Sequence, residues 1–354
     1  MSLNQSACPN LSRNVSDPYL DIAPFELPNL IYASSSILIL VIFSAILLDL
    51  EILVTFARRP RLINPFSIHM LNVTVINLLT AAIYDPILLL RNLGGREIFR
   101  GNMGLCGVYK YLQWTTIGMC AIQHCIICMD RWLAVLHSNW YRTKPIRFGV
   151  NATLIGLAYQ QLWYLPLFLT DIVWVSAEAN RAERLCDITR ADKWLQVYQH
   201  VARCMTVLLP QGILVVSYPF LLYRIWGRTR VVGVAQQQQP QQQQLIKLGY
   251  RQRKAQSELR LALCSLALQI FFWMPFNVMS VLTNLRSCLP YTLDVSAFVY
   301  MFSTLLLILD PVVFLIFSVN MRREMRRHLM ALLGKPVDAD STAFELTATR
   351  NSAL

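Results

Sequence analysis

Apolar residues along this chain gather into long blocks that are separated by shorter polar stretches. Each block has about 20 or more residues with few charges, which is long enough for a helix to cross the ~30 Å hydrocarbon core of a bilayer. We therefore predict seven membrane-spanning helices, at about residues 31–57, 65–90, 104–136, 150–173, 197–226, 259–284 and 292–318. The expected fold class is an all-α membrane protein, a seven-transmembrane helix bundle.

Composition supports a membrane protein over the alternative, in which the blocks are buried helices of a large soluble protein. The chain is 55% hydrophobic and 15% charged. A soluble domain carries roughly 25% charged residues. The soluble alternative is therefore disfavoured.

Charge is distributed unevenly between the polar segments. If the N-terminus lies outside, the cytoplasmic segments hold 21 Lys and Arg against 6 Asp and Glu, whereas the outer segments hold 11 of each. Basic residues favour the cytoplasmic side, so we expect the N-terminus outside and the C-terminus inside. The basic residues flank the span ends, where anionic lipid attracts them. They indicate membrane lipids as partners and do not indicate nucleic acid.

This orientation divides the chain into four parts. Residues 1–30 form an extracellular tail, residues 31–318 form the bundle, and residues 334–354 form a cytoplasmic tail. A glutamine-rich inner loop at about 231–246 is low in complexity and is predicted to be disordered. Residues 319–333 alternate Met and Leu with Arg in a pattern typical of an amphipathic helix lying on the inner leaflet.

Sequons and cysteines agree with an outer N-terminus. Three N-glycosylation sequons occupy the first tail, at Asn4, Asn10 and Asn14. Cys106 and Cys186 both fall on the outer, oxidising side, so we expect a disulfide between the third span and the long outer loop. Cys8 and Cys288 also lie outside and are a second candidate pair. Neither the cysteines nor the histidines show a spacing typical of a metal site, and no metal or other cofactor is expected.

Asp130-Arg131-Trp132 lies near the inner end of the third block, and Arg131 stands 25 residues after Cys106. An arginine suits a switch at this place because it is always charged and can change partners without titrating. Three further motifs follow along the chain. They are Pro210 with Tyr218 eight residues later, Phe272-Trp273-Met274-Pro275, and Asp310-Pro311-Val312-Val313-Phe314.

With the seven spans, these motifs resemble a rhodopsin-like (class A) G-protein-coupled receptor over roughly residues 30–333. The resemblance implies that Arg131 stays near Asp130 at rest and swings to meet the C-terminal helix of a heterotrimeric G protein. Trp273 would lie beneath the ligand pocket, and Pro275 would kink the sixth helix where it pivots. The remaining residues of this predicted G-protein switch are Tyr218, Asp310, Pro311 and Phe314.

Several positions depart from the family pattern. Asn77 stands where the second helix usually has Asp, and Asp49 stands where the first helix usually has Asn, although Glu51 also fits that register. Buried carboxylates are costly unless they are paired, hydrated or protonated. We expect Asp49, Asn77 and Asp310 to share a polar, hydrated site that binds sodium or a proton. Further departures are Trp132, Gln269 and Phe314, at places where the family usually has Tyr, Phe and Tyr.

The resemblance also bears on the ligand. Gln113 stands where amine receptors have Asp, and Thr304 stands where opsins have the retinal lysine. Amines and retinal are therefore disfavoured, and a peptide or a small acidic molecule is favoured. Arg203 is the cation placed to bind a carboxylate, unless it snorkels or pairs with a loop. The predicted pocket is Gln113, Trp114, Arg203, Asn277 and Tyr300.

We therefore expect a plasma-membrane receptor that transmits an extracellular ligand signal to G proteins. One alternative is a receptor-like protein with weak or no G-protein signalling, because the motifs are altered. A multi-pass transporter would predict repeat symmetry and broken helices, which the sequence does not show. A membrane enzyme ranks last, because no nucleophile–base pair or metal spacing is found. Arrestin and, at Ser352-Ala353-Leu354, a PDZ domain are further candidate partners.

Overall fold

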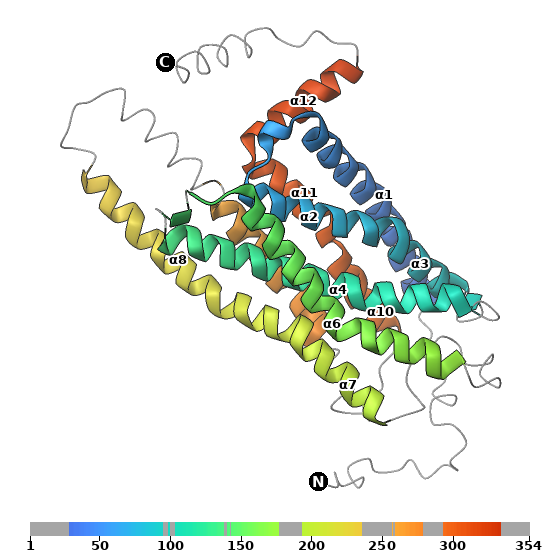
Figure 1. Cartoon of the computed structure of the whole chain (residues 1–354). Coiled ribbons are helices and arrows are strands. Elements are labelled where there is room, and N and C mark those ends of the chain that lie inside the picture. The colour runs from blue at the N-terminus through green and yellow to red at the C-terminus, as the bar shows by residue number, and fades with distance from the viewer. Residues whose placement is uncertain are drawn as a thin grey trace.

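All of the regular structure in the described part of the chain is helical in this computed structural model (Figure 1). The described residues are 28–94, 98–99, 103–137, 140–141, 143–176, 193–235, 257, 259–278 and 293–333. The long helices are α1 (Pro28–Arg58), α2 (Pro65–Leu79), α3 (Asp85–Gly94), α4 (Met103–Leu136), α6 (Ile146–Ser176), α7 (Lys193–Arg203), α8 (Leu209–Ala235), α10 (Leu293–Thr304), α11 (Leu306–Phe317) and α12 (Val319–Leu332). A further helix, Leu259–Val278, is the sixth span.

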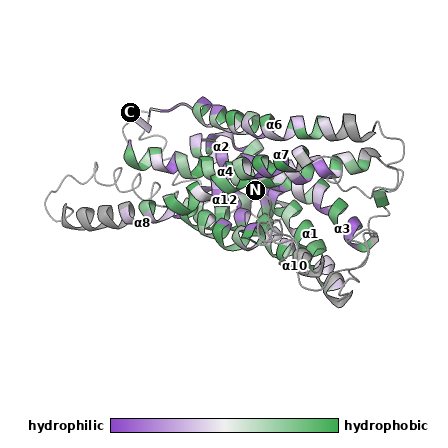
Figure 2. Cartoon of the chain, turned by 90° about the horizontal axis from the view of Figure 1, so that it is seen from below, coloured by the Kyte–Doolittle hydropathy of each residue, from purple (hydrophilic) through white to green (hydrophobic). Residues whose placement is uncertain are grey.

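These helices form a seven-helix bundle, as the hydrophobic pattern predicted. Six of the described helical stretches are long and apolar enough to cross a membrane. Helix α6, with 31 residues, runs beside them as the remaining long helix. Seen from below, much of the length of the helices has the green colour of hydrophobic residues (Figure 2). The protein is a multi-pass membrane protein.

Three spans are interrupted, and prolines explain two of the interruptions. A π-helical turn, Thr80–Tyr84, precedes Pro86 in the second span, and another, Cys204–Leu208, precedes Pro210 in the fifth. Proline lacks the backbone N–H, so the helix locally changes its hydrogen bonding. The seventh span breaks at Leu305, just after hydroxyls that bond to their own backbone. Such local bonds compete with the helical ladder.

Helix α4 is the central helix of the bundle. In its most apolar window 61% of the residues are buried, against 28% in α1. Its closest neighbour is α6, and two glycines permit the approach. A Cβ at Gly118 would collide with the Gln160 side chain, and one at Gly156 would come within 2.7 Å of Ile126. Small residues at such crossings let membrane helices pack closely.

Helix α12 follows the seventh span directly and is joined to α1. Arg59 Nε lies 3.1 Å from Glu324 Oε2, and His328 Nδ1 lies 2.7 Å from Glu51 Oε1. Figure 1 shows α12 at the same end of the bundle as the end of α1. These contacts give Glu51 a partner outside its own helix. The position of α12 on a membrane leaflet stays a prediction.

Some sequence predictions fall outside the described residues. They are the outer tail with Asn4, Asn10 and Asn14, the C-terminal tail, most of the glutamine-rich loop, and Cys8, Cys186 and Cys288. Helix α8 runs to Ala235, so residues 231–235 of the loop that we predicted to be disordered are helical. Cys106 is disulfide-bonded, but its expected partner Cys186 is among the residues not described.

Candidate functional site

Asp130 and Arg131 form a buried ion pair at one end of α4, hereafter the Arg131 end of the bundle. Arg131 donates to Asp130 Oδ2 from NH2 at 2.5 Å and from Nε at 3.1 Å. Both residues are only 3% exposed. The Tyr141 hydroxyl donates to the Asp130 carboxylate at 2.8 Å and accepts from Arg131 NH2 at 2.8 Å. Hydrogen bonds to charged groups are the strong ones, so this arrangement fixes the guanidinium.

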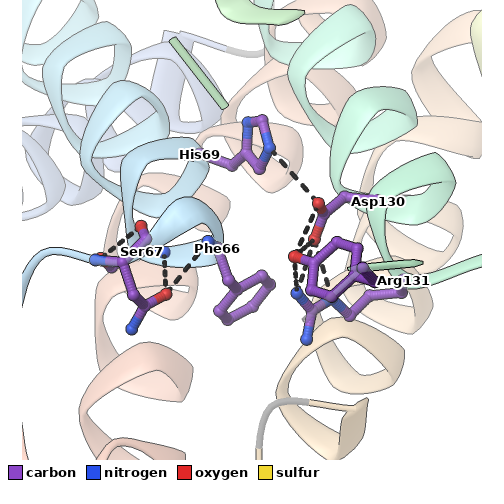
Figure 3. A network of polar contacts seen from close by, with 7 residues as sticks. Phe66, Ser67, His69, Asp130 and Arg131 are labelled. Atoms are coloured by element: carbon purple, nitrogen blue, oxygen red, sulfur yellow. Dashed lines mark hydrogen bonds and ion pairs between the residues drawn. The ribbon is translucent and has the colours of Figure 1, made fainter. Parts of the chain in front are cut away.

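Helix α2 closes the other side of the ion pair (Figure 3). The Arg131 guanidinium lies 4.0 Å from the centre of the Phe66 ring, a cation–π contact. His69 is fully buried, and its Nε2 lies 3.8 Å from Asp130 Oδ1. Asn64 caps α2 by accepting from the backbone N–H groups of Phe66 and Ser67, which sets the start of this helix. The cap therefore positions Phe66 beneath Arg131.

Tyr218 and Phe314, which we predicted as parts of the same switch, lie in different clusters. Tyr218 packs against a core of α4, α8 and sixth-span residues, near Trp132. Trp132 stacks on Phe220 at 4.3 Å between ring centres. Phe314 stacks on Phe56 of α1 at 6.0 Å. An apolar ring at 314 therefore joins the seventh span to the first.

The predicted mid-bundle polar residues are all buried. Asp49 and Asp310 interact electrostatically, and both Asp49 oxygens lack a hydrogen-bond partner among the described residues. Asn77 Nδ2 also has none in the described part of the chain. Asp310 differs in part, because its Oδ1 accepts from Ser265, whereas its Oδ2 has no hydrogen bond to a described residue and lies 3.3 Å from His124 Nε2 as an ion pair. The unpaired groups are compatible with a hydrated site, and sodium or proton binding there stays a prediction.

A small, partly open cavity of about 30 Å³ lies next to this site, on its side towards the Cys106 end of α4. Its polar lining is Asn77, Thr80, Thr116, Cys120, Trp273, Tyr300, Ser303 and Thr304. The four hydroxyls of threonine and serine each donate to a carbonyl of their own helix. In contrast, Trp273 Nε1 and Asn77 Nδ2 have no acceptor among the described residues. The lining therefore offers unpaired donors to a guest that carries acceptors.

Of the predicted pocket residues, only Tyr300 is among those that line the cavity. Tyr300 donates to Asp85 Oδ1 at 3.2 Å and so joins the seventh span to the second. Asn277 donates to Gln211 Oε1 at 2.7 Å and joins the sixth to the fifth. The Arg203 guanidinium is half-buried and lies 6.0 Å from the centre of the Phe276 ring. Arg203 therefore points towards the sixth span, which suits an inward-facing cation.

Trp114 and Gln113, like Asn277 and Arg203, do not line this cavity. Trp114 is buried against Tyr164 of α6, with ring centres 6.1 Å apart. Gln113, the residue before it, is half-buried. Neither is among the lining residues. Helix α4 instead presents Thr116, Ile117 and Cys120 to the cavity, one turn further from the Cys106 end.

Sequence reasoning missed two residues that the structure places at the centre of the site. Tyr141 follows the end of α4 and bonds to both charges of the switch. His124 lies one turn after Cys120 and reaches the seventh span. A polar histidine in an apolar stretch two turns before Arg131 was the available signal for His124. Tyr141 offered no comparable signal.

Comparisons with known proteins agree with this geometry. A family model described as "7 transmembrane receptor (rhodopsin family)" matches residues 50–314. The long-wave-sensitive opsin 1 of Felis catus is 21% identical over 94% of this chain and 88% of its own length. The 12-(S)-hydroxy-5,8,10,14-eicosatetraenoic acid receptor of Homo sapiens is 26% identical over 82% of this chain and 86% of its own length. The endothelin-1 receptor of Bos taurus is 27% identical over 33% of this chain and 28% of its own length.

Proposed function

Since this chain belongs to the rhodopsin family of seven-transmembrane receptors, we propose that it is a plasma-membrane receptor that signals to heterotrimeric G proteins. The observation that carries the proposal is the arrangement around Arg131. A permanently charged guanidinium is buried at one end of the central helix, with Asp130, Tyr141 and Phe66 as its partners. This arrangement holds the charge in place and leaves it able to exchange partners.

The proposed work is a shift of population between two bundle states, not catalysis. In the resting state Arg131 stays with Asp130 and Tyr141, as in this structure. In the active state the sixth span moves away from α4 at the Arg131 end, and Arg131 meets the C-terminal helix of the G protein. A ligand drives the change only if it binds the active state more tightly than the resting state.

The favoured ligand is a small molecule that carries a carboxylate. Arg203 faces the sixth span, and Trp273 Nε1 and Asn77 Nδ2 are donors without described acceptors at the cavity. Charge-assisted bonds from arginine to carboxylate are strong and specific. One similar human protein is named as the receptor of a hydroxylated fatty acid, which is a carboxylic acid. A peptide is the second candidate, because part of the chain is similar to the endothelin-1 receptor.

The test is ligand-independent and ligand-stimulated G-protein activation in cells, measured as dissociation of heterotrimers from each Gα class. Wild type is compared with Arg131→Ala and with Arg326→Ala, which removes an exposed arginine on α12. We expect at least one heterotrimer to respond to wild type and to Arg326→Ala, and the response to be lost in Arg131→Ala. If surface-expressed wild type activates none of them, either at rest or with a panel of carboxylic acids and peptides, the proposal fails.

A further inference from the structure

His124, in the middle of α4, is held in one orientation by its own helix. The residue is fully buried. Its Nδ1 lies 2.8 Å from the carbonyl oxygen of Cys120, one turn earlier. A carbonyl can only accept, so Nδ1 carries a hydrogen and donates it. This bond fixes the ring and directs Nε2 across the bundle, because the partner of one ring nitrogen orients the other.

Nε2 of His124 meets groups from two other spans. Asp310 Oδ2 of α11 lies 3.3 Å away. The Gln269 amide nitrogen of the sixth span lies 3.2 Å from Nε2, as a packing contact, because an amide N–H can only donate. A bare ring nitrogen and a carboxylate oxygen are both acceptors, so a proton on one of them must lie between the two. The contact of His124 with Asp310 is therefore an ion pair. It ties α4 to α11.

The sixth span is joined to this pair at two positions one helical turn apart. Ser265 Oγ donates to Asp310 Oδ1 at 3.1 Å. Gln269 Nε2 donates to Cys120 Sγ at 3.5 Å. Asp310, Ser265 and Gln269 are each 2% exposed, so water does not compete for these bonds. We call His124, Asp310, Ser265 and Gln269 the latch.

The latch lies between the cavity and the switch. Cys120, one turn from His124, lines the cavity. Arg131 lies seven residues further along the same helix, which is about 10 Å at 1.5 Å per residue. Asp49 of α1 interacts with Asp310, and Asn77 of α2 lines the cavity together with Cys120. Movement of the sixth span away from α4 would separate Gln269 and Ser265 from their partners in a place where an unpaired polar group is costly.

We propose that His124 is a positioning residue that holds the sixth span against α4 and α11 in the resting state. The proposal rests on the proposed receptor function, because release of the latch is the movement that activation requires. Loss of the His124 contact then favours the active state before any ligand binds. The polar Gln269, at a place where the resemblance leads one to expect Phe, is explained as the sixth-span part of the latch.

The experiment uses the full-length receptor in lipid nanodiscs and needs no ligand. His124→Leu removes every bond of the ring, whereas His124→Gln keeps an amide that can still donate to Asp310. Gln123→Leu is the matched control, since Gln123 is equally buried on the same helix and its side chain has no described hydrogen-bond partner. Each variant also carries Arg260→Cys with a bimane label, because Arg260 is exposed at the start of the sixth span.

We expect His124→Leu to shift the bimane emission and to raise basal nucleotide exchange on purified G proteins about tenfold, the scale expected for a lost charge-assisted bond. His124→Gln should stay near wild type, and Gln123→Leu should match it. If His124→Leu alone is poorly folded, the double variant His124→Leu/Asp310→Asn replaces both ionisable partners and should give the same shift.

The outcomes separate this inference from the proposed function. A bimane shift without nucleotide exchange on any G protein supports the latch and counts against G-protein signalling. An unchanged bimane spectrum in folded His124→Leu, or an equal shift in Gln123→Leu, overturns the latch.

Discussion

Removal of the Tyr141 hydroxyl is the smallest change that tests the resting switch. Tyr141→Phe keeps the ring, whose centre is 5.5 Å from the Arg131 guanidinium, and deletes the oxygen that bonds to Asp130 and Arg131. The ion pair of Asp130 and Arg131 remains, with its contacts of 2.5 and 3.1 Å. The change is therefore confined to the bonds of one hydroxyl group.

The size of the effect follows from the charge of the partners. A hydrogen bond to a charged group contributes roughly 1.5–3 kcal/mol. If the active state does not form these bonds, the equilibrium shifts towards it by about that amount, which is about 10-fold to 100-fold in the population ratio. We expect basal nucleotide exchange to rise by at least about tenfold until it saturates.

The assay is nucleotide exchange on purified G protein without ligand, at equal receptor concentration. Tyr111→Phe is the matched control, because it deletes a hydroxyl that donates to Gln161 at 2.8 Å, far from the ion pair. This control should leave basal exchange unchanged. A rise of less than about twofold in folded Tyr141→Phe, well below the value of one such bond, would refute the idea that Tyr141 stabilises the resting switch.

Two further predictions follow. In a dose–response measurement with a carboxylate agonist, Arg203→Ala should reduce the potency of the agonist at least about tenfold, because a charge-assisted bond is lost. Arg203→Lys should reduce the potency less. Equal potency in wild type and Arg203→Ala would show that Arg203 does not belong to the pocket. Gly156→Leu should lower the melting temperature of the purified receptor, because the leucine side chain would meet Ile126 and Ile122. Such overpacking destabilises a folded protein by about 1–3 kcal/mol. An unchanged melting temperature would contradict the close packing of α4 on α6.

The sequence predicts the bundle well because spans are set by local composition. Block length and polarity are enough to place the helices, and the spacing from Cys106 to Arg131 identifies the central one. Contacts between spans follow from tertiary packing, which the period of one helix does not encode. The position of Asp49 near Asp310 was predictable, because the family pattern aligns both residues with the polar middle of the bundle. The bonds of His124 were not, because they need the relative rotation of three helices.

The turn after α4 is a different case. Tyr141 lies ten residues beyond Arg131, outside the span, and no hydrophobic period applies to it. Only the path of the chain after α4 brings its hydroxyl back to Asp130. Trp114 shows the same limit within a helix. It lies next to a position that the family uses for ligand, but its side of α4 faces α6.

The switch and the latch can be tested as parts of one equilibrium. Tyr141 stabilises the resting state at the end of α4, and His124 does so two turns earlier, through separate partners. Effects on free energy add for sites without shared partners. If both act on a single two-state bundle, Tyr141→Phe/His124→Leu should raise basal exchange by the product of the single effects until it saturates. The double variant could instead be no more active than the stronger single variant while basal exchange is still below saturation. That result would show that both contacts belong to one local rearrangement and are not two independent restraints along α4.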